Sequence, residues 1–330
     1  MAASNRFQGL KPAIAEKIRL YEDREFTYDE PIPFCGLEIY PITMRHYNEF
    51  LNVNSCLLLD RTSDIKGLRM TNLEYLLSKM KDVEGDDLAT QEARLLSYKF
   101  SRLIELVFHT QMGVRCKRCG KVMSYLEYAE HYALYKEMSS KNTTGEPIVY
   151  KEIPCDCGKE ERDIRNWENV LRYGVDNTPK KKPTLILNGQ VITSADFDLF
   201  RQVVMYQNLP DYFDDSWIDP NIREDHNAKM ELQRKSNPVS ATTELKMLAV
   251  AESTGYKLED VYNLPIRKFL LLLNLIDDKL TYTTTRIGVM SGMVSLKEPI
   301  EHWLYKKETD VYGDSYKTLD QVQADVEKLG

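Results

Sequence analysis

Two short cysteine–glycine segments constrain this chain more than any other feature of its sequence. They read CKRCG at residues 116–120 and CDCG at residues 155–158. Four thiolates in two pairs are the ligand set that a tetrahedral zinc ion requires. The sequence therefore predicts a structural Zn²⁺ site with the ligands Cys116, Cys119, Cys155 and Cys157. A site closed by four sulfur atoms has no position open to substrate, which indicates a structural role rather than catalysis.

The residues beside the cysteines agree with this interpretation. Gly120 and Gly158 can take backbone conformations that direct N–H groups toward the sulfur atoms. Nearby positive charge lowers the free-energy cost of holding thiolates. The cations around the first segment are Arg115, Lys117, Arg118 and Lys121.

Other arrangements of the cysteines are open. The four thiols could form two disulfides or lie buried without a metal, but we expect no secretory signal, and a reducing compartment disfavours disulfides. The second pair has the spacing CxC rather than CxxC, so His109 or His131 is an alternative ligand. Cys35 and Cys56 have no neighbour at metal-binding spacing, and we interpret them as small buried hydrophobic residues.

Most of the remaining sequence has helical periodicity, interrupted by two hairpin signals. One hairpin is predicted within 26–43 with its turn at Cys35-Gly36, and the other within 184–193 at Asn188-Gly189, a type I′ turn sequence. Helices are predicted over 12–21, 43–59, 70–81, 88–110, 194–207, 242–255 and 265–278. The fold class that follows is α+β, mainly helical, with short β-hairpins, a four-Cys zinc-ribbon-like module and a C-terminal helical domain.

Several helix ends carry recognisable signals. Thr43 and Ser194 are predicted N-caps, and either Ser240 or Thr242 caps the helix that ends at Gly255. Pro265 begins the long apolar helix that follows. Beyond residue 278, the segment 281–289 either continues that helix or breaks it at Gly288.

The patterns predict five regions along the chain. They are a flexible N-terminal arm with one helical stretch (1–25), a hairpin with helices (26–113), a zinc-ribbon-like module with a helical insert (114–178), a hairpin with helices and an acidic aromatic loop (179–239), and a C-terminal helical domain with a tail (240–330). The insert has tyrosines on one helical face. The loop 209–220 either docks a partner through its aromatic side chains or folds them back as a small secondary core.

Composition argues against several classes of function. The net charge of −7 disfavours a dedicated nucleic-acid-binding protein, which would carry a strongly basic domain or stripe. The longest apolar stretch, 269–273 with an extension to residue 276 across Asn274, is too short to span a bilayer. Phosphate-binding glycine loops, zinc-protease motifs and nucleophile elbows are all missing from the sequence, and its histidines are scattered. We therefore expect neither an enzyme nor a membrane protein.

With its segments placed, the chain resembles the tail and baseplate assembly proteins of tailed bacteriophages. The resemblance is to the baseplate-hub family with a zinc ribbon, and to proteins encoded beside tape-measure genes. It rests on the cysteine ribbon together with the segments 31–50, 188–208 and 254–304. It implies a structural or chaperone protein that acts through protein–protein contacts with other tail or baseplate proteins, in the virion or in the host cytoplasm during assembly. A homo-oligomer is compatible with this role.

Two other functions compete with this interpretation. A zinc-ribbon nucleic-acid-binding or transcription-associated factor would use the basic residues 115–121 and the tyrosines of the insert to contact phosphates and bases. A metal-dependent hydrolase would need an open coordination position on the metal, which four thiolates do not leave.

Overall fold

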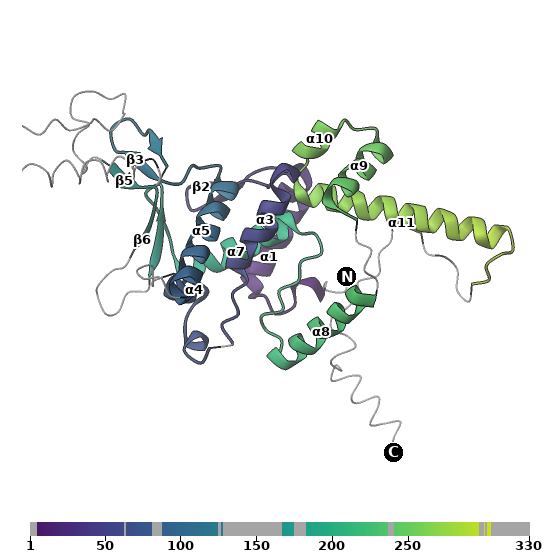
Figure 1. The fold of residues 1–330 in the computed structure, drawn as a ribbon, viewed down its shortest axis with the longest axis horizontal. Helices are drawn as coiled ribbons and strands as arrows, with labels where there is room; N and C mark the ends of the chain where they lie inside the picture. Colours follow the sequence, from purple (N-terminus) through teal and green to yellow (C-terminus); the bar gives the residue numbers. More distant parts are fainter. Residues whose placement is uncertain are drawn as a thin grey trace, which may run out of the picture. The chain divides into compact units, whose positions relative to one another are not determined.

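The computed structural model describes residues 5–62, 64–80, 88–124, 127, 167–174, 183–236, 241–296, 300 and 302–304 (Figure 1). Helices dominate, and the described strands pair antiparallel in small sheets. This confirms the predicted α+β, mainly helical class. Over the described ranges, no helix combines the length and apolar character needed to cross a membrane.

The chain divides into two compact units that do not follow the predicted domain boundaries. The first unit comprises Met1–Glu22, Thr43–Arg45 and Met205–Gly330, and the second comprises Asp23–Ile42 and His46–Val204. Residues from the beginning of the chain therefore belong to the same unit as its last third. Local periodicity cannot report such a grouping, because it depends on contacts between segments far apart in sequence.

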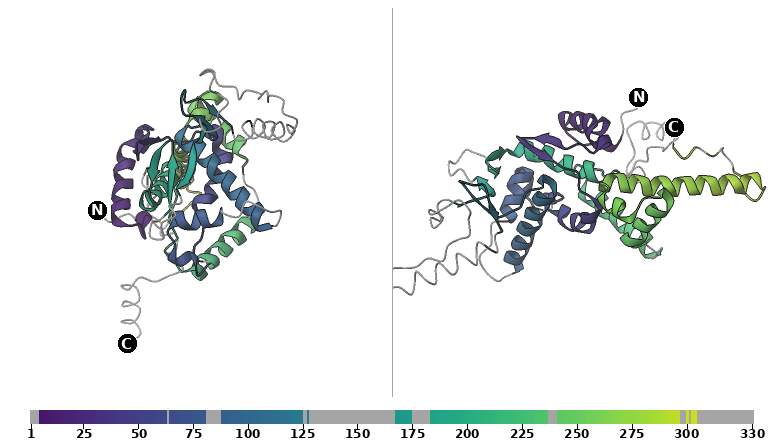
Figure 2. Two further views of the ribbon diagram at one scale, coloured as in Figure 1. Left: turned by 90° about the vertical axis from the view of Figure 1, so that its left-hand side faces the viewer. Right: turned by 90° about the horizontal axis from the view of Figure 1, so that it is seen from above.

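The first unit is helical. Its elements are η1 (Asn5–Phe7), α1 (Pro12–Asp23), the end of α7 (Ser194–Asn208), α8 (Pro220–Ser236), α9 (Thr243–Thr254), α10 (Leu258–Asn263) and α11 (Ile266–Met290). The helix predicted from Pro265 continues through Gly288 and ends at Met290, well beyond residue 278. Its C-terminal half extends past α9 and α10 (Figures 1 and 2).

The predicted N-terminal arm is a packed part of this unit from residue 5 onward. Ile18 on α1 is fully buried, and Phe7 is 7% exposed. The ring of Phe7 lies 5.4 Å from that of Tyr206 on α7. Residues 5–22 therefore contribute to the core of the unit instead of extending away from it.

The acidic aromatic loop 209–220 also packs inward. Gly9 lies so close to Trp217 that a Cβ atom at residue 9 would sit 1.9 Å from Cδ1 of the indole. Phe213 and Trp217 make an edge contact at 6.3 Å between ring centroids, and Ile218 is 5% exposed. Of the two arrangements that the sequence allows, the structure has the loop folded back as a small secondary core.

The second unit contains the sheets and a cluster of helices. Its helices are α2 (Glu25–Tyr28), η2 (Met44–His46, shared with the first unit), α3 (Tyr47–Val53), η3 (Asn54–Leu57), η4 (Gly67–Arg69), α4 (Asn72–Lys79), α5 (Leu88–Phe108) and most of α7. The single helix predicted over 43–59 is wrong. The segment is divided into η2, α3 and η3, and Thr43 forms a β-bridge with Pro265 rather than an N-cap.

Three small sheets complete the second unit. The strands β1 (Ile32–Phe34) and β2 (Leu37–Ile39) form the predicted hairpin, with its turn at Cys35-Gly36. The second predicted hairpin is also present as β7 (Thr184–Leu187) and β8 (Gln190–Ile192), with Asn188 at φ 49° and Gly189 at φ 82°. A strand that the sequence did not indicate, β6 (Leu171–Gly174), pairs with β7. The third sheet has the order β4-β3-β5, formed by β4 (Val122–Met123), β3 (Val114–Cys116) and β5 (Trp167–Asn169).

Aromatic side chains form the core of the second unit. The rings of Phe108 on α5 and Phe200 on α7 stack at 5.5 Å with an interplanar angle of 7°. Phe34 on β1 lies 5.7 Å from Phe200, and Phe100 meets Phe197 at 6.2 Å. These contacts hold the first hairpin and two long helices together, because burying each aromatic side chain removes a large apolar area from water.

The observed caps refine the predicted helix ends. Thr242 accepts a hydrogen bond from Leu245 N, and Gly255 has φ 75°, which confirms the caps of α9. For α7 the capping residue is Thr193 rather than Ser194, because its hydroxyl accepts from Asp196 N while the Asp196 carboxylate accepts from Thr193 N. Thr71 and Glu74 form a reciprocal capping box at the start of α4.

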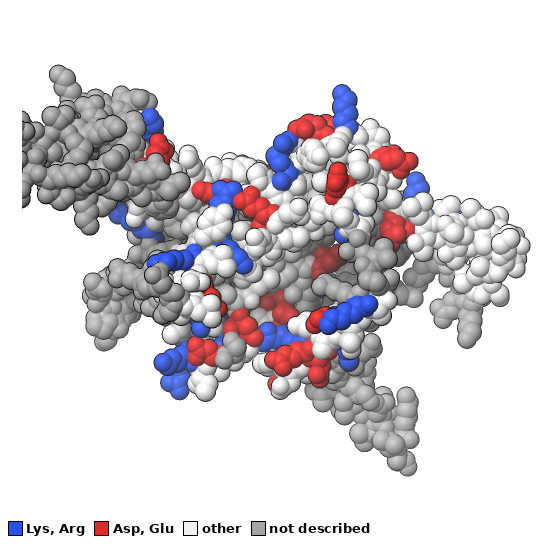
Figure 3. Space-filling model, in the orientation of Figure 1, with Lys and Arg blue, Asp and Glu red and all other residues white. Residues whose placement is uncertain are grey.

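Charged side chains of both signs are interspersed over most of the described surface in the view of Figure 3. The projecting end of α11 differs, because no lysine, arginine, aspartate or glutamate is visible on it in this view.

Candidate metal centre and surface groove

The first cysteine segment forms a tight hairpin. Strand β3 (Val114–Cys116) pairs with β4 (Val122–Met123), so Cys116 ends a strand and Cys119 lies in the turn. Cys116 N donates to Lys121 O, and Gly120 N donates to Cys116 O, both at 2.9 Å. Gly120 has φ 76°, the left-handed conformation expected of it. This turn places the two thiols on one short hairpin, which fits the first half of a four-thiolate zinc site.

A third strand supports the hairpin from its other side. β5 (Trp167–Asn169) pairs with β3, and Trp167 lies opposite Cys116. Val114, Cys116, Met123 and Trp167 form a buried apolar cluster. Cys155 and Cys157 lie outside the described residues, so of the four predicted ligands the structure places Cys116 and Cys119. The segment that carries the second pair connects β4 to β5, the two neighbours of β3.

Ion pairs link β5 both to β3 in its own sheet and to β6 in the β6-β7-β8 sheet. Arg115 on β3 and Arg172 on β6 both donate to Glu168 on β5, at 2.8 and 2.7 Å. The hydrogen bond from Arg115 is the main cause that lowers the pKa of Glu168 below its ordinary value. Arg115 is thus engaged with a carboxylate. Lys117, Arg118 and Lys121 are exposed around the cysteine turn.

The alternative ligand His109 is engaged elsewhere, and His131 lies outside the described residues. The imidazole of His109 stacks on the ring of Tyr40 at 4.3 Å and 13°. Burial, and secondarily the charge of His46, lower the pKa of His109. The described part of the chain holds no group of three or more His, Cys, Asp or Glu residues arranged to bind a metal.

The remaining two described cysteines differ from each other. Cys56 is 2% exposed, and burial raises the pKa of its thiol to about 12, as expected for a small buried hydrophobic residue. Cys35 is only half-buried and occupies the turn of the first hairpin at φ 47°. The interpretation as a buried hydrophobic residue therefore fits Cys56 and not Cys35.

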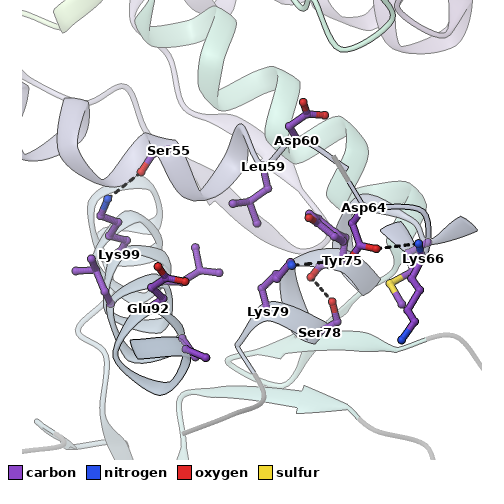
Figure 4. A pocket seen from close by; sticks show the side chains of 15 residues that line it. Ser55, Leu59, Asp60, Asp64, Lys66, Tyr75, Ser78, Lys79, Glu92 and Lys99 are labelled. Atoms are coloured by element: carbon purple, nitrogen blue, oxygen red, sulfur yellow. Dashed lines mark hydrogen bonds and ion pairs between the residues drawn. The ribbon is translucent and has the colours of Figure 1, made fainter. Parts of the chain in front are cut away.

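A groove of about 760 Å³ opens on the surface of the second unit (Figure 4). Its walls come from α5 on one side and from η3, the following loop and α4 on the other. The lining residues are Ser55, Leu59, Asp60, Asp64, Lys66, Met70, Tyr75, Ser78, Lys79, Ala89, Glu92, Ala93, Leu95, Leu96 and Lys99. Apolar side chains from both walls and charges of both signs therefore share one concave surface.

Interactions across the rim hold the polar groups in place. Lys79 Nζ lies 3.9 Å from Asp64 Oδ2 and 5.2 Å from the ring centroid of Tyr75. On the opposite wall, Lys99 donates to the hydroxyl of Ser55 at 3.1 Å. The hydroxyls of Ser55 and Ser78 donate to main-chain carbonyl oxygens, those of Asn52 and Tyr75. These serine hydroxyls are thus bonded to the main chain three residues before them.

Large apolar side chains surround the groove and reach solvent. Leu95 is 54% exposed, and Ile65 and Leu68 on the loop before α4 are 83% and 58% exposed. Sequence reasoning missed this surface. The only local signal was that α5 carries leucines on more than its buried face. Periodicity could not reveal the groove itself, because its other wall comes from a segment that is separate from α5 in the sequence.

Comparisons with known proteins add no relative. No protein-family model matches this sequence, and searches of curated proteins and of solved structures return no significant match.

Proposed function

We propose that this protein is a structural or chaperone component in the assembly of a bacteriophage tail or baseplate, and that it works through protein–protein contacts. The observation that carries the contact role is the groove between α4 and α5 in the second unit. The phage context rests on the resemblance of the segments 31–50, 188–208 and 254–304 to tail and baseplate assembly proteins.

The composition of the groove suits a segment of another protein. Leu95 lines the groove, and Ile65 and Leu68 lie on the loop beside it. Covering these exposed apolar side chains with a partner removes them from water, which stabilises the complex. Lysines and carboxylates at the rim provide electrostatic complementarity, which selects among partners more than it adds affinity. The groove brings apolar and charged side chains together on one concave surface, a mixture that is also found in protein interfaces.

The zinc site has a supporting role in this proposal. Cys116, Cys119, Cys155 and Cys157 would hold the ion, which would cross-link the segments on either side of β3 without taking part in a reaction. The tight hairpin that carries Cys116 and Cys119 supports this role. The sheet β4-β3-β5 would then be a rigid support within the second unit.

Co-purification with the tail and baseplate proteins of the same phage tests the contact role. The full chain, the groove variant Leu95→Lys and the matched control Leu20→Lys are compared as bait. Leu20 on α1 is 61% exposed and belongs to the first unit, so both variants introduce a lysine at an exposed leucine. We expect Leu95→Lys to lower retention of a tail protein by about tenfold or more, as for loss of an interface anchor, while the control retains it. Equal retention by both variants, or no retained tail protein, would refute the proposal.

Metal content tests the zinc site separately. We expect one zinc ion per purified chain and loss of that ion in Cys116→Ser. Cys56→Ser is the control, because Cys56 is buried away from any proposed ligand set and should leave the zinc content unchanged. The cobalt-substituted protein should show the absorption of a four-thiolate site. Full zinc occupancy in Cys116→Ser would remove Cys116 from the ligand set.

A second candidate function, binding of nucleic acid by the ribbon, has one observation in its favour. Lys117, Arg118 and Lys121 are exposed around the cysteine turn and could contact phosphates. The net charge of −7 opposes it. Salt-dependent binding of a labelled single-stranded DNA at physiological ionic strength, lost in Lys117→Glu with Lys121→Glu, would favour this candidate.

A further inference from the structure

Helix α11 carries an uninterrupted 3-4 repeat of mostly apolar residues. The repeat runs along the whole helix at alternating intervals of three and four residues. Its members are Ile266, Phe269, Leu273, Ile276, Leu280, Thr283, Ile287 and Met290. Only Thr283 is not apolar. A mean interval of 3.5 residues is the period of a coiled-coil seam, in which each side chain inserts between four residues of a facing helix.

The first part of this seam is covered within the chain. Ile266 and Phe269 are fully buried, as are Val250 on α9 and Val261 on α10. α9 packs directly against α11. The seam therefore begins as an ordinary helix–helix contact of the first unit.

Among the described residues, the second part of the seam is exposed. Leu280 is 62% exposed, Ile287 is 61% exposed and Met290 is 79% exposed. This is the half of α11 that extends past α9 and α10 (Figure 2). Replacing these three side chains by polar ones would not disturb the packing of the described residues. The folding of the single chain therefore does not explain why these positions are apolar.

The chain that follows α11 returns along a different face. Met293 N donates to Gly288 O at 2.9 Å, and a Cβ atom at Gly288 would lie 3.0 Å from a methyl group of Val294. The ring of His302 lies 5.4 Å from that of Tyr282. In a helix with this repeat, Tyr282 and Gly288 occupy positions on the side away from the seam. The described returning segment therefore leaves the seam uncovered.

We propose that the exposed half of the α11 seam forms a parallel coiled coil with a second copy of this chain. A second copy presents the same repeat with the same period, so each layer from Leu273 to Met290 meets an identical layer. The inference goes beyond the proposed function, because it concerns self-association through the first unit and does not involve the groove.

The flanking charges favour the parallel orientation. In a parallel pair, Lys279 and Arg286 face Thr284 and Ser291 of the partner subunit, which carry no charge. In the antiparallel register that matches the most layers, Lys279 faces Arg286 of the partner subunit, and like charges repel at that distance. Repulsion between these like charges thus disfavours the antiparallel pair, and no such repulsion arises in the parallel pair.

Sedimentation equilibrium of the full chain, over a range of concentrations, tests self-association. We expect a reversible dimer for the natural sequence, and at least about a hundredfold weaker association for the double variant Leu280→Glu with Ile287→Glu, because each chain loses two buried apolar anchors. Both residues are exposed in the single chain, so folding should be retained, as checked by circular dichroism.

The matched control is Leu271→Glu. Leu271 is 45% exposed on the same helix but lies off the seam, so this variant should dimerise like the natural sequence. Two results would overturn the proposal: a monomer at every concentration, or equal weakening by Leu271→Glu. Dimerisation that appears only after removal of residues 305–330 would also overturn it, because the seam would then be covered by the chain's own C-terminal segment.

Cross-linking distinguishes the two orientations. In a parallel pair, residue 287 faces residue 287 of the other copy, so Ile287→Cys should form a disulfide-linked dimer that peptide mass spectrometry maps to this position. Thr281→Cys, which is exposed but off the seam, should not. Linkage of Ile276→Cys in one chain to Ile287→Cys in another, without the 287–287 link, would refute the parallel arrangement.

Discussion

Glu22 illustrates how single charged residues hold the first unit together. Its carboxylate accepts hydrogen bonds from Arg6 at 2.7 Å and from Arg267 at 3.1 Å. Arg267 also donates to the main-chain oxygen of Tyr206, whose own hydroxyl donates to Arg6 O. Burial lowers the pKa of Arg267 and raises that of Tyr206. Glu22 therefore offsets the positive charge of two partly buried arginines, which water screens less than it screens exposed side chains.

Replacing this carboxylate should be costly. We expect Glu22→Gln to lower the free energy of unfolding of the first unit by about 3 kcal/mol, because two partly buried arginines lose their shared counter-charge. Urea denaturation followed by tryptophan fluorescence measures the change. Glu259→Gln is the control: its partner Arg45 is half-exposed, and such a pair contributes about 0–1 kcal/mol. Equal effects of the two substitutions would contradict this account of the buried network.

His109 should make the stability of the second unit depend on pH. Burial and the charge of His46 lower its pKa, so the unfolded chain binds a proton at this residue more tightly than the folded chain does. The free energy of unfolding should accordingly be highest above the ordinary histidine pKa of about 6.5 and fall as the pH drops through that value toward the lower folded pKa. Denaturation midpoints between neutral and mildly acidic pH measure this dependence.

Two variants separate the causes of the His109 shift. His109→Asn, which suits the observed φ of 49°, should flatten the pH dependence. His46→Gln should raise the pKa of His109 in an NMR titration without restoring its ordinary value, because burial is the larger cause. An unchanged His109 titration in His46→Gln would rule out the electrostatic contribution.

At the scale of elements, the tight approach of Gly113 to β4 fixes the ribbon sheet. A Cβ atom at residue 113 would lie 1.9 Å from the main-chain oxygen of Met123, which cannot move without disturbing the β3–β4 pairing. We expect Gly113→Ala to reduce both zinc content and thermal stability. Gly120→Ala, where no atom lies within 4 Å of the added methyl group, should cost only about 1 kcal/mol from backbone strain. Measured zinc content and unfolding temperatures of the two variants test this order.

Element types were predictable wherever the signal is local. Asn188-Gly189 dictates a tight hairpin, and Thr242 with Gly255 marks both ends of α9. The helix over 43–59 could not be predicted correctly, because tertiary contacts override its periodicity. Thr43 pairs with Pro265, and the Ser55 hydroxyl donates to Asn52 O, which tightens the chain into η3.

The candidate sites were predictable to different degrees. Cysteine spacing is a local property, so the sequence singles out Cys116 and Cys119 as a pair, whereas the β3–β4 hairpin that holds them was not predicted. The groove does not, because its walls join residues 55–79 to residues 89–99 and neither segment has a chemical motif. The 3-4 repeat of α11 was present in the sequence, but whether its residues are buried or exposed depends on where α9 and α10 end.

At the scale of the whole molecule, the beginning of the chain stabilises its last third. We expect Ile18→Ala to lower the free energy of unfolding of the first unit by about 2–5 kcal/mol, the cost of truncating a fully buried side chain. Leu20→Ala on the same helix, where the side chain is 61% exposed, should change it by less than about 0.5 kcal/mol. A flexible arm would instead tolerate both substitutions equally in a denaturation experiment.

The packing of Trp217 on Gly9 gives the molecule an intrinsic optical reporter. An indole in van der Waals contact with a main-chain segment changes its emission when that segment departs and water replaces it. Trp217 is 40% exposed, so a quencher in solution can already reach part of the ring, and undocking of residues 5–22 would open the rest. With Trp167 and Trp303 replaced by phenylalanine, the fluorescence of one residue would report, in real time and without a label, whether residues 5–22 stay docked on the rest of the first unit.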